Sequence, residues 1–326
     1  MGRHAAAECP ELDAKIDAAC AGIGAEIGSL AIPGLAGVVL GGGYGRGEGG
    51  VRETAEGPAL SNDLDFYVVT EEGAGSAERA AIAKALAPVS EKWSAKLGAD
   101  ADFCEPKTPW RLKHDEERIM VQELVRGYFD VAGKKGGELF AHVARRPPEA
   151  IPWMEAARLL MNRGIGLLFA RGKEARVRFG FEDPRGDFAA RNVNKCVLGA
   201  GDAKLVVRGA YRWRAEERAA ALGDGLYRDA VEWKFRPRAE APCSWEAARK
   251  AWLDAEEEAM ERGRREGALK RSLREGARWI ARSRSFGGAA DFGRDCTVRV
   301  LLRVAGAVRG NGAIDAELVR LWRIFN

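Results

Sequence analysis

The sequence predicts an α+β fold in which a mixed first half is followed by an all-helical second half. Short apolar runs and stretches of helical spacing alternate along the chain before Pro147. After Pro147 and Pro148, apolar residues recur at intervals of three and four, and strand-like alternation is almost absent. We therefore expect a first domain at residues 1–148, with a mixed sheet and flanking helices, and a helical domain at residues 149–326.

The first half is expected to begin with a helix, because Leu12, Ile16 and Ile23 have the spacing of one helical face. Pro33 and Gly34 then interrupt the chain before a short apolar run that is typical of a buried strand. The predicted elements are helices at residues 11–30 and 77–97, strands at residues 35–40, 63–70, 99–105 and 119–128, and a glycine-dense loop at residues 41–50.

The second half is expected to be helical throughout. Ala157, Leu160 and Gly164 begin a series with helical spacing. Further helices are predicted at residues 189–207, 245–283, 296–308 and 316–324.

Composition limits the classes of protein to consider. With 46% hydrophobic and 31% charged residues, the chain can bury a core. A net charge of +4, from 52 basic and 48 acidic residues, argues against a dedicated nucleic-acid binder. No apolar run is long enough to span a membrane, and the six cysteines are scattered without zinc spacing. We expect a cytoplasmic protein with reduced thiols and no membrane partner.

Asp63 and Asp65 form an acidic pair on a predicted strand. Residues two apart on a strand point to the same side, so these carboxylates project together while Leu64 and Phe66 point to the core. Two adjacent carboxylates repel each other unless they share a proton or bind a cation. Their oxygen atoms suit Mg²⁺.

Asp100 and Asp102 repeat this arrangement on a later strand. One of them would complete a three-carboxylate site with Asp63 and Asp65 for two Mg²⁺ ions about 3.5–4 Å apart. Side-chain direction does not choose between the two, because both project from the same face. We prefer Asp102, because it lies deeper in the predicted strand, whereas Asp100 follows Gly98 at the start of that strand.

The loop GGGYGRGEGG at residues 41–50 offers a second kind of site. Backbone N–H groups approach a polyphosphate closely only where side chains are absent, and a loop of such groups binds anions. Arg46 would add a charge-assisted contact to phosphate. A lone glycine loop or a lone Asp-x-Asp is a weak signal, but their ordered combination is much stronger.

The segment Gly42-Gly43-Tyr44-Gly45-Arg46-Gly47-Glu48, followed by Asn62-Asp63-Leu64-Asp65, resembles the nucleotidyltransferase superfamily that includes DNA polymerase β. The glycine segment is most similar to the transferase domains of PII uridylyltransferases. The resemblance implies that Gly42 and Gly43 hold a triphosphate and that Asp63 and Asp65 bind metal. It further implies that Asp102 or Asp100 binds metal and activates the acceptor hydroxyl as a base. The separation of Gly43 from Asp63 is longer than this family commonly shows.

The second half is similar to the helical domain attached to many bacterial members of this superfamily, through LLMNRGIGLL and NKCVLGAGDAKLVVRGAY. Lys195 and Asp202 are seven residues apart and share a helical face, with Gly199 between them. Lys195 would either reach the phosphates of an NTP or be an ordinary surface lysine. Asn162 and Arg163 are further candidates for the same site.

These patterns together predict a magnesium-dependent nucleotidyltransferase that moves a nucleotide from an NTP to an acceptor hydroxyl. The acceptor would be a protein, an RNA end or a small molecule. The alternative is a catalytically silent nucleotide-binding or antitoxin-like partner protein with the same fold. Intact Asp63 and Asp65, with a third carboxylate available, favour catalysis.

Overall fold

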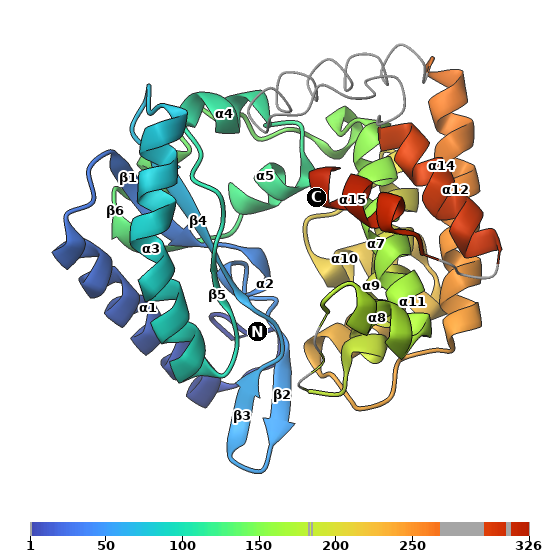
Figure 1. Cartoon of the computed structure of the whole chain (residues 1–326), viewed down its shortest axis with the longest axis horizontal. Helices are drawn as coiled ribbons and strands as arrows, with labels where there is room; N and C mark the ends of the chain where they lie inside the picture. The colour runs from blue at the N-terminus through green and yellow to red at the C-terminus, as the bar shows by residue number, and fades with distance from the viewer. Residues whose placement is uncertain (1, 182, 184, 268–296, 311–313, 326) are drawn as a thin grey trace. The chain divides into compact units, whose positions relative to one another are not determined.

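The structure, a computed structural model, describes residues 2–181, 183, 185–267, 297–310 and 314–325. Two compact units make up the chain (Figure 1). Unit 1 contains the described residues of Met1–Pro147 together with Lys234–Arg238, and unit 2 contains those of Pro148–Trp233 and Ala239–Asn326. The fold is α+β: unit 1 combines sheets with helices, and the described part of unit 2 is helical.

The main sheet of unit 1 has four strands, β1 (Leu35–Leu40), β4 (Leu64–Thr70), β5 (Ala101–Phe103) and β6 (Phe129–Gly133). Their order across the sheet is β5-β4-β1-β6. β1 is antiparallel to β4 and to β6, whereas β4 and β5 are parallel. Parallel neighbours need a crossover connection, which the long helix α3 (Ser76–Leu97) provides.

Helices cover both faces of this sheet (Figure 1). α1 (Pro10–Leu30) and α3 lie on one face, and α4 (Pro109–His114), α5 (Ile119–Leu124) and α6 (Gly136–Leu139) contribute to the core on the other. Successive residues of β4 contribute to the two cores in turn, because neighbouring residues on a strand point to opposite faces of the sheet. Leu64, Phe66 and Val68 enter the core under α1 and α3, while Tyr67 and Val69 face the opposite core.

A short helix and a hairpin lie between β1 and β4. The helix α2 (Gly42–Gly45) directly follows β1, and β2 (Val51–Thr54) pairs with β3 (Gly57–Leu60) as a two-stranded sheet. This hairpin accounts for the long separation between Gly43 and Asp63.

Most of the helices and strands expected from the sequence are confirmed, but the strand predicted at residues 119–128 is wrong. That segment contains the helix α5, and the strand β6 begins only at Phe129. Val121, Leu124 and Val125 are buried at helical spacing, which is the pattern of a short amphipathic helix. Gln122, fully buried beside them, donates hydrogen bonds to the carbonyl oxygens of Glu116 (2.6 Å) and Ala144 (2.8 Å).

The described helices of unit 2 are α7 (Trp153–Arg171), α8 (Lys173–Arg178), α9 (Phe188–Val207), α10 (Ala215–Leu222), α11 (Gly225–Phe235, whose last two residues belong to unit 1), α12 (Trp245–Arg265), α14 (Thr297–Arg309) and α15 (Ala316–Phe325), after the 3₁₀ helix η1 (Pro148–Ala150). Trp252 of α12 is fully buried and donates a hydrogen bond to the carbonyl oxygen of Leu160 in α7 (2.8 Å). Gly164 leaves room for that indole ring. Residues 268–283 of the helix predicted from 245, and residue 296 of the next, lie outside the described residues.

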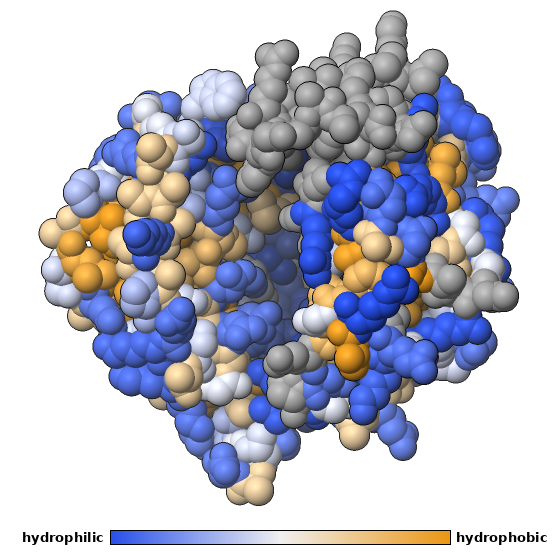
Figure 2. All heavy atoms as spheres, viewed as in Figure 1, coloured by the Kyte–Doolittle hydropathy of each residue, from blue (hydrophilic) through white to orange (hydrophobic). Residues whose placement is uncertain are grey.

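On the face of unit 1 drawn in Figure 2, hydrophilic residues are mixed with hydrophobic ones, the most hydrophobic of which gather near the C-terminal end of α1. Among the helices that the structure describes, none combines the length and the apolar character needed to cross a lipid bilayer.

Candidate active site

Asp63 and Asp65 lie at the N-terminal end of β4. Asp63 is exposed and immediately precedes the strand, and Asp65 is a half-buried residue within it. Leu64 and Phe66, between and beyond them, are fully buried in the core under α1 and α3. Strand alternation therefore turns Asp65 away from that core.

Asp102 lies directly opposite Asp65 in the sheet. The parallel register of β4 and β5 pairs Leu64 with Ala101, Asp65 with Asp102, and Phe66 with Phe103. Residues paired in this way project from the same face, and the rings of Phe66 and Phe103 stack on the core side, 5.0 Å apart. The two carboxylates therefore share the opposite face of the sheet.

Asp100 precedes β5, and its carbonyl oxygen accepts a hydrogen bond from the Leu64 amide (2.8 Å). Partial burial, followed by the negative charges of Asp63 and Asp100, raises the pKa of Asp102 above its ordinary value. In the described part of the chain, no ion pair involves Asp63, Asp100 or Asp102. Several carboxylates thus gather without an internal cation, an arrangement that a bound cation stabilises.

Cys104 directly follows β5, two residues after Asp102. Burial, together with the charges of Asp65 and Asp102, raises the pKa of its thiol to about 12, so the sulfur stays protonated at neutral pH. Among the described residues, no three His, Cys, Asp or Glu side chains form a ready-made metal-binding group. Mg²⁺ does not require one, because it retains several water molecules and is held by one or two carboxylates together with substrate phosphates.

The glycine loop lies against Asp65. Gly42 has a positive φ of 59°, and a Cβ atom at this position would lie 2.0 Å from Oδ2 of Asp65. The amide of Gly41 donates a hydrogen bond to the carbonyl oxygen of Asp65 (2.8 Å). Only glycine combines this backbone conformation with so close an approach. The loop and the first carboxylate strand are therefore joined through both main chain and side chain.

Tyr44 anchors the loop from within, a role that no sequence pattern indicated. The side chain is 2% exposed, and its hydroxyl donates to the carbonyl oxygen of Gly50 (2.7 Å). The same hydroxyl accepts a hydrogen bond from the amide of Ser61 (2.9 Å). Tyr44 thus ties both ends of the hairpin to the loop. Ser61, at the second of these ends, lies two residues before Asp63.

Arg46, expected to contact phosphate, lies between two carboxylates. Its guanidinium forms ion pairs with Glu123 of α5 (3.0 Å) and Glu48 (3.6 Å) and is only 13% exposed. Glu48 is itself 1% exposed and also pairs with Lys234 (3.6 Å). An incoming phosphate would have to compete with these carboxylates for Arg46.

The site residues expected in the second half belong to unit 2. Asn162 of α7 accepts a hydrogen bond from the indole of Trp322 (3.1 Å), and Lys195 is half-buried on α9. Arg163 fills the space beside Gly199, where a Cβ atom would lie 2.4 Å from Cγ of Arg163. Burial lowers the pKa of Arg163, an effect that nearby Asp202 opposes. Gly199 is therefore covered by an arginine side chain.

Asp202 belongs to a buried polar network on α9, α10 and α11. It accepts a hydrogen bond from the Tyr227 hydroxyl (2.5 Å) and pairs with Arg218 (2.9 Å), which is 4% exposed. The Arg218 guanidinium also lies over the ring of Tyr211, 5.1 Å from its centre. These contacts indicate a structural role for Asp202.

Comparisons with known proteins do not assign the chain to a family. No family model matches it, and neither the curated proteins nor the solved structures contain a match.

Proposed function

We propose that this chain is a magnesium-dependent nucleotidyltransferase, which transfers a nucleoside monophosphate from an NTP to an acceptor hydroxyl and releases pyrophosphate. One observation carries the proposal. Asp65 is in contact with the glycine loop through Gly42 and lies opposite Asp102 on the adjacent strand. A glycine-rich loop and a carboxylate pair thereby lie together at one end of the sheet, which supports the proposal.

The carboxylate set fits magnesium. Asp63, Asp65 and Asp102 offer hard oxygen ligands from two adjacent strands. When bound, two magnesium ions would neutralise negative charge on the phosphate oxygens as the bond to the leaving group breaks.

The glycine loop would hold the triphosphate through the backbone of Gly42 and Gly43. These residues open the short helix α2, and first-turn amides have no partner within their own helix. The absence of side chains lets phosphate oxygens approach these amides closely. Arg46 would add positive charge beside them, reduced by its pairing with Glu48 and Glu123.

In the proposed reaction, the acceptor oxygen forms a bond to the α-phosphorus of the NTP. The bond from that phosphorus to the bridging oxygen breaks, and its electrons leave with pyrophosphate. The proton of the acceptor hydroxyl passes to Asp102, which acts as the base. Because the nucleotidyl group is transferred directly, the residues act by positioning and electrostatics rather than by covalent catalysis.

Unit 2 would contribute Lys195, Asn162 and Arg163 to nucleotide binding. Of these, Arg163 lies in a desolvated position that would strengthen any interaction with an anion. The acceptor would be a protein, an RNA end or a small molecule.

The test combines binding with transfer. Isothermal titration with ATP, UTP, CTP and GTP, with and without Mg²⁺, identifies the nucleotide. The protein is then incubated with the α-labelled nucleotide and a cell extract, and released pyrophosphate and labelled products are measured. We expect magnesium-dependent binding of at least one nucleotide, with label transferred and pyrophosphate released in equal amounts.

The matched control is Glu72→Gln, which removes an exposed carboxylate from the loop after β4, at the opposite end of that strand. Glu72→Gln should retain both nucleotide binding and nucleotide transfer, whereas Asp65→Asn should lose transfer. Magnesium-dependent binding with no transfer would support the catalytically silent nucleotide-binding protein instead. If none of the four nucleotides binds, the proposal is wrong.

A further inference from the structure

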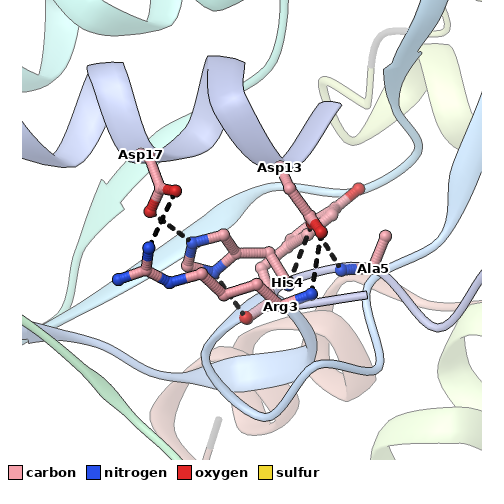
Figure 3. Close-up of polar contacts among 6 residues, drawn as sticks. Arg3, His4, Ala5, Asp13 and Asp17 are labelled. Atoms are coloured by element: carbon pink, nitrogen blue, oxygen red, sulfur yellow. Dashed lines mark hydrogen bonds and ion pairs between the residues drawn. The ribbon is translucent and has the colours of Figure 1, made fainter. Parts of the chain in front are cut away.

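The N-terminal segment is fixed against the glycine loop by backbone hydrogen bonds. The amide of Ala6 donates to the carbonyl oxygen of Gly49 (2.9 Å), and the amide of Gly49 donates to the carbonyl oxygen of His4 (3.0 Å). On the other side, the Asp13 carboxylate of α1 accepts hydrogen bonds from the amides of Arg3 (2.7 Å), His4 (2.9 Å) and Ala5 (3.2 Å) (Figure 3). His4 is thus held between α1 and the loop.

The His4 ring has an oxygen acceptor at each nitrogen. Nδ1 lies 3.2 Å from the carbonyl oxygen of Tyr44, and Nε2 lies 3.0 Å from Oδ1 of Asp17 (Figure 3). The side chain is 1% exposed, and the ring packs edge-on against Phe129, 5.1 Å away. A neutral imidazole carries one N–H group and can donate to only one of these oxygens. The imidazolium form donates to both.

Charged and titratable groups also lie beside His4. Asp17 contributes a carboxylate from α1, and its second oxygen accepts a hydrogen bond from Arg3 (3.0 Å). The Cys20 thiol, near Asp17, is neutral because burial raises its pKa to about 12. From β6 the contacting group is the phenyl ring of Phe129, and from the loop it is a carbonyl oxygen, neither of which titrates.

Tyr44 connects His4 to the candidate active site. It directly follows Gly43, and its hydroxyl joins Gly50 to Ser61. If the hydrogen bond between His4 and the carbonyl oxygen of Tyr44 were lost, the loop would lose its connection to α1 at Tyr44.

We infer that His4 is a positioning residue: its imidazolium form joins Asp17 to the carbonyl oxygen of Tyr44 and fixes the glycine loop, and loss of one ring proton loosens that loop. The effect on NTP affinity rests on the proposed function, whereas the proton-dependent contact itself does not.

The experiment follows the ring and the loop separately in the full chain. Side-chain NMR over about pH 5 to 8, the range in which histidine changes charge, reports the protonation of His4. Hydrogen-exchange protection factors of the Gly45 and Glu48 amides, which donate to loop carbonyls, report the loop. The Val125 amide, at the C-terminal cap of α5, is the internal reference. We expect loop protection to fall about tenfold as His4 loses its proton, with Val125 unchanged.

Two variants separate this role from simple packing. Asp17→Asn supplies an amide donor to Nε2, so a neutral ring can keep Nδ1–H for Tyr44, and loop protection should become independent of pH while remaining high. Arg3→Gln is the matched control: it removes the partly exposed ion pair with Asp17 but leaves both acceptors of His4 in place. It should retain the pH dependence.

A neutral His4 throughout this range, or a titration of His4 without a change in loop protection, would overturn the inference. Loss of the pH dependence in Arg3→Gln would do so as well. NTP affinity in Mg²⁺ is measured on the same samples. If loop protection follows His4 but the wild-type protein binds no nucleotide at any pH, the proposed function fails and the positioning role of His4 stands.

Discussion

The surroundings of Asp65 differ from those of an ordinary half-buried strand carboxylate. A glycine with positive φ lies over its Oδ2 atom, and a second carboxylate, Asp102, occupies the paired position on β5. Gly42 makes room for the carboxylate, and Asp102 adds negative charge beside it. In the proposed site, a bound cation would offset this negative charge.

Asp63→Ala and Asp65→Ala are each expected to abolish nucleotide transfer and leave the fold intact. Metal ligands contribute several kcal/mol of transition-state stabilisation, so less than about a tenth of the activity should remain. Because each substitution relieves carboxylate repulsion, the thermal midpoint without Mg²⁺ should hold or rise slightly. Turnover and thermal unfolding in EDTA check both points, with Glu72→Gln as the control. Substantial activity in either variant would contradict the assignment.

Asp102→Asn is expected to remove a pH dependence of stability. The folded-state pKa of Asp102 is raised above the ordinary value of 3.8, so the folded protein retains this proton to higher pH than the unfolded chain does. Stability therefore declines as pH rises from below 3.8 through the folded-state pKa. In EDTA, the variant should match the wild type at the acid end and be more stable at pH 7.

Turnover measured on Asp102→Asn and Asp100→Asn distinguishes the two residues. As the base, Asp102 should affect turnover far more than NTP affinity, since its partner is the acceptor hydroxyl in the transition state. Asp100→Asn should change both only slightly. Equal small losses in the two variants would remove Asp102 from the proposed site.

At the scale of elements, the glycine loop and the hairpin behave as one folded segment. Tyr44, buried within the loop, binds both Gly50 at the start of the hairpin and Ser61 at its end. The hairpin therefore returns the chain to the loop directly before Asp63. Its extra length changes the path between loop and carboxylates but keeps the two together.

Gly42→Ala should disrupt this segment. Alanine at a positive φ of 59° is strained by about 1–3 kcal/mol, and its Cβ would collide with Asp65. We expect the free energy of unfolding to fall by at least about 1 kcal/mol, and NTP affinity to fall as well. Gly28→Ala is the control, because it lies inside α1 with no atom within 4 Å of the added Cβ. It should stabilise the protein by up to about 1 kcal/mol. Equal effects in chemical denaturation would show that Gly42 carries no special constraint.

The wrong prediction of a strand at residues 119–128 is also explained at the scale of elements. Ile119, Val121 and Leu124 fit either a short strand or one face of a helix, since a few apolar residues do not separate the two periods. The helix is favoured by the buried Gln122 amide, whose carbonyl partners belong to Glu116 and Ala144. The contact with Ala144 is distant in sequence, so local spacing did not indicate it.

At the scale of the whole molecule, unit 1 includes a segment from far along the chain. Lys234 pairs with the buried Glu48, and its carbonyl oxygen packs against Gly50. A fragment ending at Pro147 would lack both contacts. Residues from the second half are therefore part of the support of the glycine loop.

Lys234→Met should destabilise the protein by about 1–3 kcal/mol, because it removes a cation from a carboxylate that is 1% exposed. Lys250→Met is the matched control: Lys250 is 78% exposed and pairs with Asp254 on the same helix, so the substitution should cost little stability. Urea unfolding of both variants gives the comparison. If both cost the same, the Lys234–Glu48 pair does not support the loop.

Lys195→Ala tests whether the helical unit contributes to nucleotide binding. We expect a higher dissociation constant for NTP with no loss of helix, because alanine is a better helix former than lysine. Titration calorimetry and far-UV circular dichroism measure the two effects. An unchanged dissociation constant would exclude Lys195 from the site.

The sequence by itself determined the local features of this protein. Apolar spacing defined the helix at residues 11–30 and the strand at residues 35–40, and the period of two placed Asp63 and Asp65 opposite the core residues Leu64 and Phe66. These features depend on residues a few positions apart, so periodicity is sufficient to predict them.

The tertiary structure alone decided which distant residues meet. The parallel register set Asp102, and not Asp100, opposite Asp65. Packing also brought Glu123 to Arg46 and Lys234 to Glu48. The physical reason is that register and ion pairing follow from how separate elements bury their apolar faces. A one-residue slip of β5 would exchange the faces of all its side chains without changing the local sequence pattern.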